Sequence, residues 1–411
     1  MPEPRRRLRL SITFQSLRHP NYRLWFTGQV VSLFGTWMQS TAQGYFIYDL
    51  TRSPAYLGYV SFANGLPAWL LTLYGGLVAD RFARRSVLVV TQTTAMLLAF
   101  VLAALSFARI VQPWHILVLA TLSGIVNAFD APARQSFVME LVQREDLTNA
   151  IALNSTMFNM ATALGPAVGG LVYAAFGPAW CFTINGVSFL AVIGALLRMR
   201  LAPARNVGRR GAALRDIWEG IRYSLREPAI RLLTLIAGLV TLFGFSVLTL
   251  IPAWSVEILQ GDATTNGLLQ SARGVGALAS ALTIASLGAF TFRGKFLLAG
   301  LASLPVFIFL FSRTTTLWLS VLTLAGVGAA IIAVYNLCNS LIQTRVEDRL
   351  RGRVMAFYTV VFSGMLPLGG LVVGQVAEWI GAIPTVTGCA ALCGLLAIVL
   401  WLAAPALRTL Q

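Results

Sequence analysis

Residues 76–88 read Gly-Leu-Val-Ala-Asp-Arg-Phe-Ala-Arg-Arg-Ser-Val-Leu, and this stretch is the strongest indicator of the fold. It places one acid and three arginines between two apolar segments, residues 56–79 and 86–107. Each segment is long enough to cross a bilayer, which takes about 20 apolar residues. Because charged side chains avoid the hydrocarbon interior, these four mark a tight turn between two membrane-spanning helices. The stretch therefore predicts a membrane protein.

Composition and hydropathy extend this prediction to the whole chain. Of the 411 residues, 57% are hydrophobic and 11% are charged, whereas soluble domains are about 25% charged. A soluble core could not bury so much apolar surface. We expect an all-α membrane protein with twelve transmembrane helices. The expected spans are residues 22–48, 56–79, 86–107, 114–134, 148–175, 180–198, 230–256, 264–287, 294–312, 317–341, 354–379 and 384–404.

The basic residues fall almost entirely on one side of this helical pattern. The net charge is +16, and only Arg52, Arg109 and Arg313 lie in loops opposite to the N-terminal side. Loops rich in Lys and Arg stay in the cytoplasm, so we expect both termini to be cytoplasmic. Topology thus accounts for the positive charge, and a nucleic-acid partner has no remaining support.

The longest polar stretch, residues 201–228, divides the spans six and six. Its first part is rich in Arg, Gly and Pro, and apolar residues then recur at helical spacing. This pattern predicts a cytoplasmic linker that carries an amphipathic helix on the inner leaflet. We therefore expect an N-terminal six-helix bundle at residues 1–200 and a C-terminal six-helix bundle at residues 229–411.

The two halves of the sequence echo each other. The loop at residues 144–147 and the following Pro166 correspond to the loop at residues 346–349 and the following Pro367. Internal repeats of this kind are typical of transporters whose substrate site lies between the repeats. The duplication therefore predicts two pseudo-symmetric bundles with a site at their boundary.

Polar residues within the spans indicate where that site lies. Ser32, Thr36, Gln39 and Gln43 form a stripe on one helical face, which either hydrogen-bonds to neighbouring helices or lines a wet cavity. Arg273 lies near the middle of its span, so it needs a water-filled cavity or a structural partner, unless it snorkels. The expected cavity residues are Thr36, Trp37, Gln39, Gln43, Asn64, Asn154, Phe158, Arg273, Tyr335 and Asn336.

The acidic residues place no carboxylate clearly at mid-depth. Asp49 and Glu378 fall near outer helix ends, and Asp130 lies toward the inner side. Asp130 and Arg134 have the spacing and order of a helical ion pair, which favours a structural role. Ion coupling uses one of these three carboxylates through water, or the ion enters elsewhere, and both alternatives stay open.

Neither a metal, nor a cofactor, nor an enzymatic site is expected. All four cysteines lie within spans, and Cys389 and Cys393 are four residues apart rather than in a C-x-x-C motif. We interpret the cysteines as packing residues. The only histidines, His19 and His115, lie near loops, and no pattern of nucleophile and base accompanies them.

The opening stretch resembles the signature loop of the major facilitator superfamily, G-x-x-x-D-R-x-G-R-R. The matching residues are Gly76, Asp80, Arg81, Arg84 and Arg85, with Ala83 in place of the second glycine. Residues 161–170 resemble the superfamily's antiporter motif, G-x-x-x-G-P-x-x-G-G, which is associated with exporters. Its matching residues are Gly165, Pro166, Gly169 and Gly170. Residues 19–25 and 130–135 are similar to the enterobactin-exporter-like branch.

This resemblance implies a multi-pass exporter of a bacterial cytoplasmic membrane that works by alternating access. It also implies that the matching residues of both motifs form a conformational gate. Asp80 would contact the cytoplasmic start of the eleventh span, near Gly352 and Arg353, when the inner side closes. One departure concerns the position four residues before Gly124, where proton-coupled drug exporters carry an arginine. Ala120 stands there instead, which leaves the usual proton relay without support.

We therefore expect a secondary exporter of amphipathic small molecules, such as drugs, siderophores or related metabolites, by proton-coupled antiport. The alternative is a lipid or lysolipid flippase of the same fold. A sensor would normally carry an added soluble domain, and none is apparent in the sequence. The expected partners are a small-molecule substrate, a proton gradient and membrane lipids, and a monomer is the expected working unit.

Overall fold

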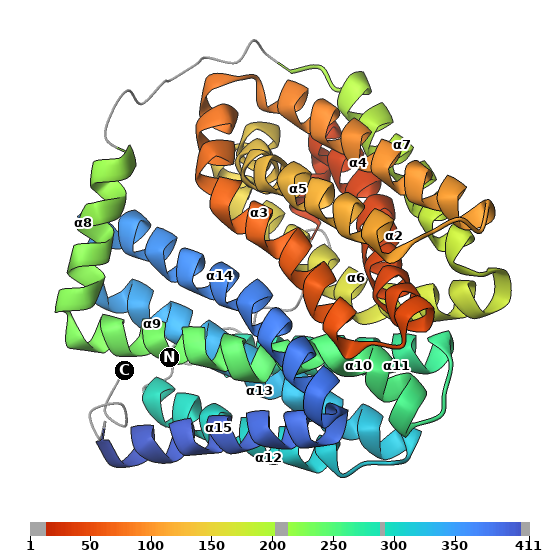
Figure 1. The fold of residues 1–411 in the computed structure, drawn as a ribbon. Helices are drawn as coiled ribbons and strands as arrows, with labels where there is room; N and C mark the ends of the chain where they lie inside the picture. Colours follow the sequence, from red (N-terminus) through yellow and green to blue (C-terminus); the bar gives the residue numbers. More distant parts are fainter. Residues whose placement is uncertain (1–13, 202–212, 288–291, 404–411) are drawn as a thin grey trace, which may run out of the picture.

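The computed structural model describes residues 14–201, 213–287 and 292–403, which are almost entirely helical and contain no strand (Figure 1). The first half comprises η1 Gln15–Arg18, α2 Pro20–Thr51, α3 Pro54–Arg81, α4 Arg84–Phe107, α5 Pro113–Leu141, η2 Arg144–Asp146, α6 Leu147–Phe176 and α7 Pro178–Arg198. A separate helix, α8 Ala213–Arg226, follows. The second half comprises α9 Pro228–Leu239, η3 Val240–Phe245, η4 Ser246–Leu250, α10 Ile251–Ala253, η5 Trp254–Ile258, α11 Ala263–Leu287, α12 Arg293–Ser312, α13 Leu317–Arg345, α14 Asp348–Ile380 and α15 Ala382–Ala403.

Twelve long helical segments of the described chain coincide with the twelve expected spans, if α9 to η5 is counted as one broken helix. Ten of them are long and apolar enough to cross a membrane. The other two, α2 and α6, have 32 and 30 residues, and polar side chains lower their hydropathy. For these two, the spanning role stays a prediction. Parts of the predicted domains lie outside the described residues. They include the first part of the linker, residues 202–212, the start of the N-terminal bundle, residues 1–13, and the end of the C-terminal bundle, residues 404–411.

Proline and glycine set the short turns between helices. Proline fixes its own φ and lacks an N–H, so it suits the first turn of a helix. Five helices begin with it, at Pro20, Pro54, Pro113, Pro178 and Pro228. Gly177 and Gly381 have φ of 85° and 88°, a region that favours glycine, and they hold equivalent places before the last helix of each half.

Close helix contacts inside the first half depend on glycine. A Cβ on Gly75 of α3 would overlap the carbonyl group of Ala128 on α5. A Cβ on Gly124 of α5 would likewise overlap the carbonyl group of Asn64 on α3. In a membrane, such backbone approach supplies the van der Waals contact that holds helices together. These two reciprocal contacts therefore fix α3 against α5.

The two halves meet along two helix pairs, α3 with α14 and α6 with α11 (Figure 1). The second long helix of each half thus packs against the fifth long helix of the other half, as a pseudo-two-fold axis requires. We call the end of the molecule with turns at residues 82–83, 142–146 and 346–347 the basic end. The far end has turns at residues 52–53, 177 and 381.

Contacts between the halves run from the far end to just past the middle of the molecule. At the far end, Ser53 Oγ donates to Glu378 Oε2 at 2.6 Å. Deeper in, Ala167 N donates to Ser271 Oγ at 2.9 Å. Trp69 Nε1 donates to the Val360 carbonyl oxygen at 2.8 Å, the hydrogen bond between α3 and α14 that lies nearest the basic end among the described residues. The far end is therefore closed.

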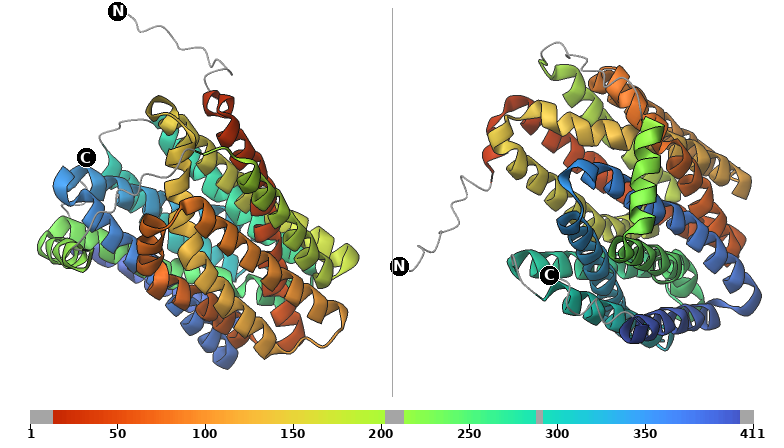
Figure 2. Two further views of the ribbon diagram at one scale, coloured as in Figure 1. Left: turned by 90° about the horizontal axis from the view of Figure 1, so that it is seen from above. Right: turned by 90° about the vertical axis from the view of Figure 1, so that its left-hand side faces the viewer.

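Helix α8 lies across the basic end of the second half, against α14 and α9 (Figure 2, right). Glu219 of α8 forms an ion pair with Arg353 of α14. A Cβ on Gly220 would lie 2.6 Å from the Arg353 carbonyl oxygen, so α8 and α14 are in close contact. Trp218 is 69% exposed, which suits a helix on the membrane surface. The amphipathic helix expected in the linker coincides with α8.

Candidate functional site

Arg273 occupies the boundary between the halves at mid-depth. It lies ten residues after the start of α11 at the far end, or about 15 Å along the helix axis. The neighbouring Gly274 brings α11 against α6, where a Cβ would lie 2.7 Å from the Thr162 carbonyl oxygen. On the other side, a Cβ on Gly328 of α13 would overlap the Arg273 carbonyl group. Close packing on both sides thus fixes the Arg273 backbone.

The Arg273 guanidinium group lies between aromatic rings of the two halves. Its Cζ is 5.9 Å from the ring centroid of Trp37 on α2 and 5.9 Å from that of Phe245 on η3. Both distances fit a cation–π interaction. The guanidinium forms no hydrogen bond or ion pair with any residue in the described ranges, and its Nε is buried without a partner.

Further rings extend this arrangement into both halves. The Phe158 ring on α6 packs edge-on against Trp37, with centroids 5.8 Å apart. In the second half, Phe362 on α14 contacts Phe245 at 6.3 Å and Tyr335 on α13 at 4.6 Å. Phe158 is 49% exposed, and the other four rings are half-buried. We call Trp37, Phe158, Phe245, Tyr335 and Phe362 the aromatic cluster.

The sequence pointed to four members of this site and missed two. Arg273, Trp37, Phe158 and Tyr335 were among the expected cavity residues. Phe245 and Phe362 were missed because a phenylalanine within a span gives no signal that separates a binding residue from a lipid-facing one. Phe245 ends the π-helical turn η3, and such turns often mark functional sites. The spacing of apolar residues did not reveal this turn.

Two other expected cavity residues form hydrogen bonds within the first half. Asn185 Nδ2 of α7 donates to Gln39 Oε1 at 2.7 Å. Asn64 Nδ2 donates to the Ala120 carbonyl oxygen at 3.2 Å. These two amide side chains therefore form hydrogen bonds between neighbouring helices.

The remaining uncharged polar residues of the expected cavity form no hydrogen bond to another helix within the described ranges. Thr36 is exposed, and its Oγ1 donates to the Ser32 carbonyl oxygen at 2.9 Å on the same helix. Asn154 is half-buried, and its Oδ1 atom is buried without a partner in the described chain. Gln43 and Asn336 are half-buried. A cavity role for these four residues stays a prediction.

Two of the three arginines in residues 76–88 hold that loop to the first half. Arg84 forms an ion pair of 2.5 Å with Glu140 at the end of α5. Arg85 donates to the carbonyl oxygens of Leu197 and Met199, at 2.8 and 3.3 Å. These carbonyl groups lie at the C-terminus of α7, where a cation is favoured by the helix dipole.

The other gate residues of this loop form no hydrogen bond or ion pair with the described part of the second half. Asp80 and Arg81 are exposed and form no hydrogen bond or ion pair with any described residue. A Cβ on Gly76 would meet nothing within 4 Å. Arg353, near which Asp80 was expected, bonds to Glu219 instead. The contact between Asp80 and α14 is thus not formed in this arrangement, and the gate role stays a prediction.

The glycines of the exporter-like motif pack α6 on two neighbours. A Cβ on Gly165 would lie 2.7 Å from Trp37 Cβ, and one on Gly169 would lie 2.9 Å from the Met38 carbonyl oxygen. Gly170 faces α11 instead, where a Cβ would lie 2.5 Å from the Ala263 carbonyl oxygen. Pro166 also faces α11, because its carbonyl oxygen contacts Gly267. The motif therefore contributes to the boundary between the halves.

Each carboxylate expected to couple an ion already has partners. Asp49 pairs with Arg52 on the far-end surface at 2.7 Å. Glu378 accepts hydrogen bonds from Ser53 Oγ at 2.6 Å and from the Ala55 N–H at 3.3 Å, both across the boundary. A third acid of the far end, Glu257, accepts a hydrogen bond from Tyr48 of the first half.

Asp130 is the carboxylate nearest to mid-depth, and it is buried. It accepts hydrogen bonds from Thr91 Oγ1 at 2.8 Å and from Gln92 Nε2 at 2.7 Å. It also pairs with Arg134 at 3.0 Å, so the predicted ion pair between these residues is confirmed. These three bonds give Asp130 a structural role within the first half.

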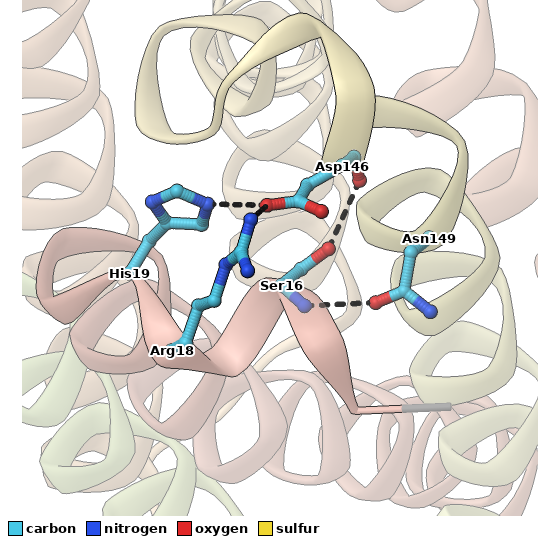
Figure 3. A network of polar contacts seen from close by, with 5 residues as sticks. All are labelled: Ser16, Arg18, His19, Asp146 and Asn149. Atoms are coloured by element: carbon cyan, nitrogen blue, oxygen red, sulfur yellow. Dashed lines mark hydrogen bonds and ion pairs between the residues drawn. The ribbon is translucent and has the colours of Figure 1, made fainter. Parts of the chain in front are cut away.

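A polar network anchors the N-terminal turn η1 at the basic end (Figure 3). Arg18 Nη2 and His19 Nε2 lie 2.8 and 2.6 Å from Asp146 Oδ2. Ser16 Oγ donates to the Asp146 carbonyl oxygen at 3.0 Å, and Ser16 N donates to Asn149 Oδ1 at 2.9 Å. The hydrogen bond from His19, followed by that from Arg18, lowers the pKa of Asp146 from its ordinary value.

Comparison with known families decides the identity of this helical bundle. The family model described as "Transmembrane secretion effector" matches residues 11–411. The chain belongs to this family, within the major facilitator superfamily. It is therefore an integral, multi-pass membrane transporter and not an enzyme, as the sequence motifs implied.

Curated relatives of this major facilitator protein include several named transporters. It is 24% identical to the staphyloferrin A transporter of Staphylococcus aureus, covering 88% of this chain and 91% of the relative. It is 27% identical to the multidrug efflux pump Tap of Mycolicibacterium fortuitum, covering 78% and 80%. It is 25% identical to the enterobactin exporter EntS of Escherichia coli O1:K1 / APEC, covering 83% and 81%. The predicted resemblance to this branch is confirmed.

Solved structures confirm the fold. The crystal structure of the nucleoside transporter NupG matches with a TM-score of 0.71 at 16% identity, over 96% of this chain and 98% of that chain. Similarity at this level of identity concerns the arrangement of helices alone.

Proposed function

We propose that this transporter exports amphipathic small molecules, such as siderophores, drugs or related metabolites, by alternating access. The observation that carries the proposal is Arg273 with partly exposed rings from both halves at mid-depth. A site built by two halves suits alternating access, because movement of one half against the other changes which side reaches it. The relatives named for staphyloferrin A, enterobactin and multidrug transport support this range of substrates.

The direction of opening follows from charge and contacts. The basic end faces the cytoplasm in this proposal, because loops rich in arginine stay inside, and both chain termini then lie inside the inner membrane. Among the described residues, hydrogen bonds between the halves reach from the far end only to Trp69. The present arrangement is therefore closed outside and ready to receive substrate from the cytoplasm.

Proton antiport is the proposed source of energy, with the monomer as the working unit. Of Asp49, Asp130 and Glu378, we favour Glu378 as the coupling carboxylate. Its two hydrogen bonds cross the boundary between the halves, so they must break when the far end opens. Asp49 and Asp130 bond within the first half and do not have this property.

A lipid or lysolipid flippase is the second candidate, and one surface feature favours it. A groove of ≈ 620 Å³ runs between α12 and α15, lined by apolar side chains such as Leu298, Phe309 and Trp401. Its size and chemistry suit an acyl chain. However, α12 and α15 both belong to the second half, so the groove offers no route between the halves. Thermal stabilisation by lysolipids and not by drugs or siderophores would favour this candidate.

Transport by purified protein in proteoliposomes tests the proposal. We expect an imposed pH gradient to drive movement of a siderophore or a lipophilic dye. Phe245→Leu should reduce this movement, because it removes a ring from the aromatic cluster. Phe309→Leu is the matched control, since Phe309 also underlies an arginine, Arg313, but lies on α12 away from the boundary. If no such compound moves under the gradient, the proposal is wrong.

A further inference from the structure

We propose that Arg273 binds an anionic group that the transported molecule carries next to an aromatic ring. This inference rests on the proposed export function and narrows its substrate class to planar oxyanions, such as aromatic carboxylates. The site consists of the Arg273 guanidinium as the charged element and the aromatic cluster as the surface for the ring.

The charge of Arg273 is uncompensated among the described residues. The guanidinium has no ion pair among the described residues, and its Nε is buried without a partner. A positive charge at this depth is costly, so it normally has a counter-ion. Asp130 is the acid nearest to this level, yet it is already bonded to Arg134. It also lies about 10 Å closer to the basic end, seventeen residues into α5 from the far end. A ligand anion is the missing partner.

The donors of Arg273 and the rings of the aromatic cluster match the two parts of such a ligand. A guanidinium group presents parallel N–H donors that match the two oxygens of a carboxylate. The terminal nitrogens of Arg273 make no hydrogen bond to the described chain, so they are available for this purpose. The cluster rings lie on both sides of the boundary, and aromatic surfaces favour a ligand ring in stacked or edge-on contact. Charge and ring are thus recognised together.

The Arg273 backbone is held rigidly within the second half, because Gly328 of α13 packs directly against the Arg273 carbonyl group. The contact of Gly274 with α6 instead crosses the boundary between the halves. Trp37 and Phe158 belong to one half, whereas Phe245, Phe362 and Tyr335 belong to the other. When the halves move, the rings from the first half therefore shift relative to the guanidinium. The anion site keeps its place while the aromatic surface around it changes, as a transported ligand requires for release.

A purely structural role for Arg273 makes a different prediction. If the guanidinium only joins Trp37 to Phe245, its loss should weaken binding of every ligand to the same extent. If it binds an anion, its loss should remove the preference for charged ligands and leave uncharged ones nearly unaffected. The comparison of a charged probe with its uncharged analogue therefore separates the two roles.

The experiment uses coumarin-3-carboxylate and its uncharged carboxamide as probes of the full-length protein in detergent. We expect the wild type to bind the carboxylate at least about tenfold more tightly than the amide. Arg273→Gln should abolish this ratio, and Arg273→Lys should retain part of it, because the lysine keeps the charge without the planar fork. Binding is followed by quenching of tryptophan fluorescence, without any gradient.

The matched control is Arg313→Gln, which removes an arginine that contacts Phe309 at 5.1 Å on the far-end surface. This variant should keep the wild-type ratio. Equal binding of the two probes to the wild type, or no saturable binding of the carboxylate, would overturn the proposal. So would an equal loss of both probes in Arg273→Gln. Because binding is measured without transport, failed export leaves this result intact, and failed anion binding leaves export of uncharged compounds possible.

Discussion

At the scale of single residues, Asp146 shows how one buried carboxylate holds a chain segment. Arg18 and His19 both contact its Oδ2 atom, and Ser16 bonds to its carbonyl oxygen. The folded pKa of Asp146 is lowered, so the stability it contributes is fully present above the unfolded pKa of about 3.9. That contribution is lost as the pH falls through the lower folded pKa. The anchor should therefore hold throughout the neutral range.

Asp146→Asn should lower the melting temperature of the purified protein at neutral pH, because it removes the charge that Arg18 and His19 contact. The difference between variant and wild type should shrink as the pH falls below about 4. Asp348→Asn is the control, since Asp348 is highly exposed and its one partner in the described part of the chain is Arg351 on its own helix. Equal melting of the Asp146 variant and the wild type at pH 7 would contradict the anchor.

Two adjacent glycines of α3 make a second prediction at this scale. Gly75→Ala should destabilise the protein by about 1–3 kcal/mol, because the added methyl group would overlap Ala128 of α5. Gly76→Ala should leave stability unchanged, since nothing lies within 4 Å of its Cβ. Thermal unfolding in detergent measures both. If Gly76 acts only as a gate residue, Gly76→Ala should fold normally and change transport alone. A folding defect in Gly76→Ala would refute the gate role.

At the scale of elements, the N-terminus of α3 and the C-terminal turn of α14 form a closure at the far end. Glu378 accepts hydrogen bonds from Ser53 and from the Ala55 N–H of the other half. Tyr59 adds a hydrogen bond of 2.9 Å to Gln375. A carboxylate at a helix N-terminus is also favoured by the helix dipole. This small set of polar contacts must break before the far end opens.

Glu378→Ala should therefore increase far-end opening. The measurement is labelling of a cysteine at position 43, from Gln43→Cys, by a reagent that does not cross membranes and is added outside right-side-out vesicles. Asp49→Ala is the matched control, because it removes a far-end acid that pairs with Arg52 of the same half and, within the described ranges, with no residue of the other half. We expect the cysteine at position 43 to be labelled faster in Glu378→Ala, and to be labelled at the unchanged rate in Asp49→Ala. Unchanged labelling would exclude Glu378 from the closure.

Element boundaries show what local patterns do and do not contain. Proline and charge placed most helix starts and ends within a few residues, because these signals act on the backbone nearby. The span at 230–256 was expected as one regular helix, yet the structure has two π-helical turns within residues 228–258. Ser246 Oγ bonds back to the Thr241 carbonyl oxygen at 3.0 Å, and Gly369 of α14 packs against Ser246. The irregular backbone around Ser246 therefore packs against α14, a helix that is distant in the sequence.

At the scale of the whole molecule, the basic end is where the two halves lack mutual hydrogen bonds among the described residues. Asp80 forms no bond to the described part of α14, and Arg353 is engaged by Glu219 of α8. We propose that closure of the basic end brings Asp80 to the start of α14, where the helix N-terminus carries about half a positive charge. Helix α8 then competes with Asp80 for the same region.

Asp80→Asn should accordingly shift the population toward the arrangement that is open at the basic end. The protein should keep its helical fold, because Asp80 is exposed and has no bond to the described chain. Labelling of a basic-end cysteine in inside-out vesicles should rise, while far-end labelling should fall. Glu219→Gln provides the opposite change, since it weakens the competing pair with Arg353 and should favour closure. Identical labelling of Asp80→Asn and the wild type would count against the latch.

The amino-acid sequence alone established the membrane class, the superfamily, the approximate helix limits and the presence of an arginine at mid-depth. These properties follow from hydropathy, charge and motif residues, which act locally and need no knowledge of neighbours. The three-dimensional arrangement was needed to show that Gln39 and Asn64 form hydrogen bonds to neighbouring helices. It was also needed to show that Phe245 contacts Arg273 and that Phe362 packs against Phe245. The Arg273 site combines α2, α11 and α14, which are far apart in sequence. Its composition depends on how glycine contacts bring those helices together, and no local pattern of residues encodes that geometry.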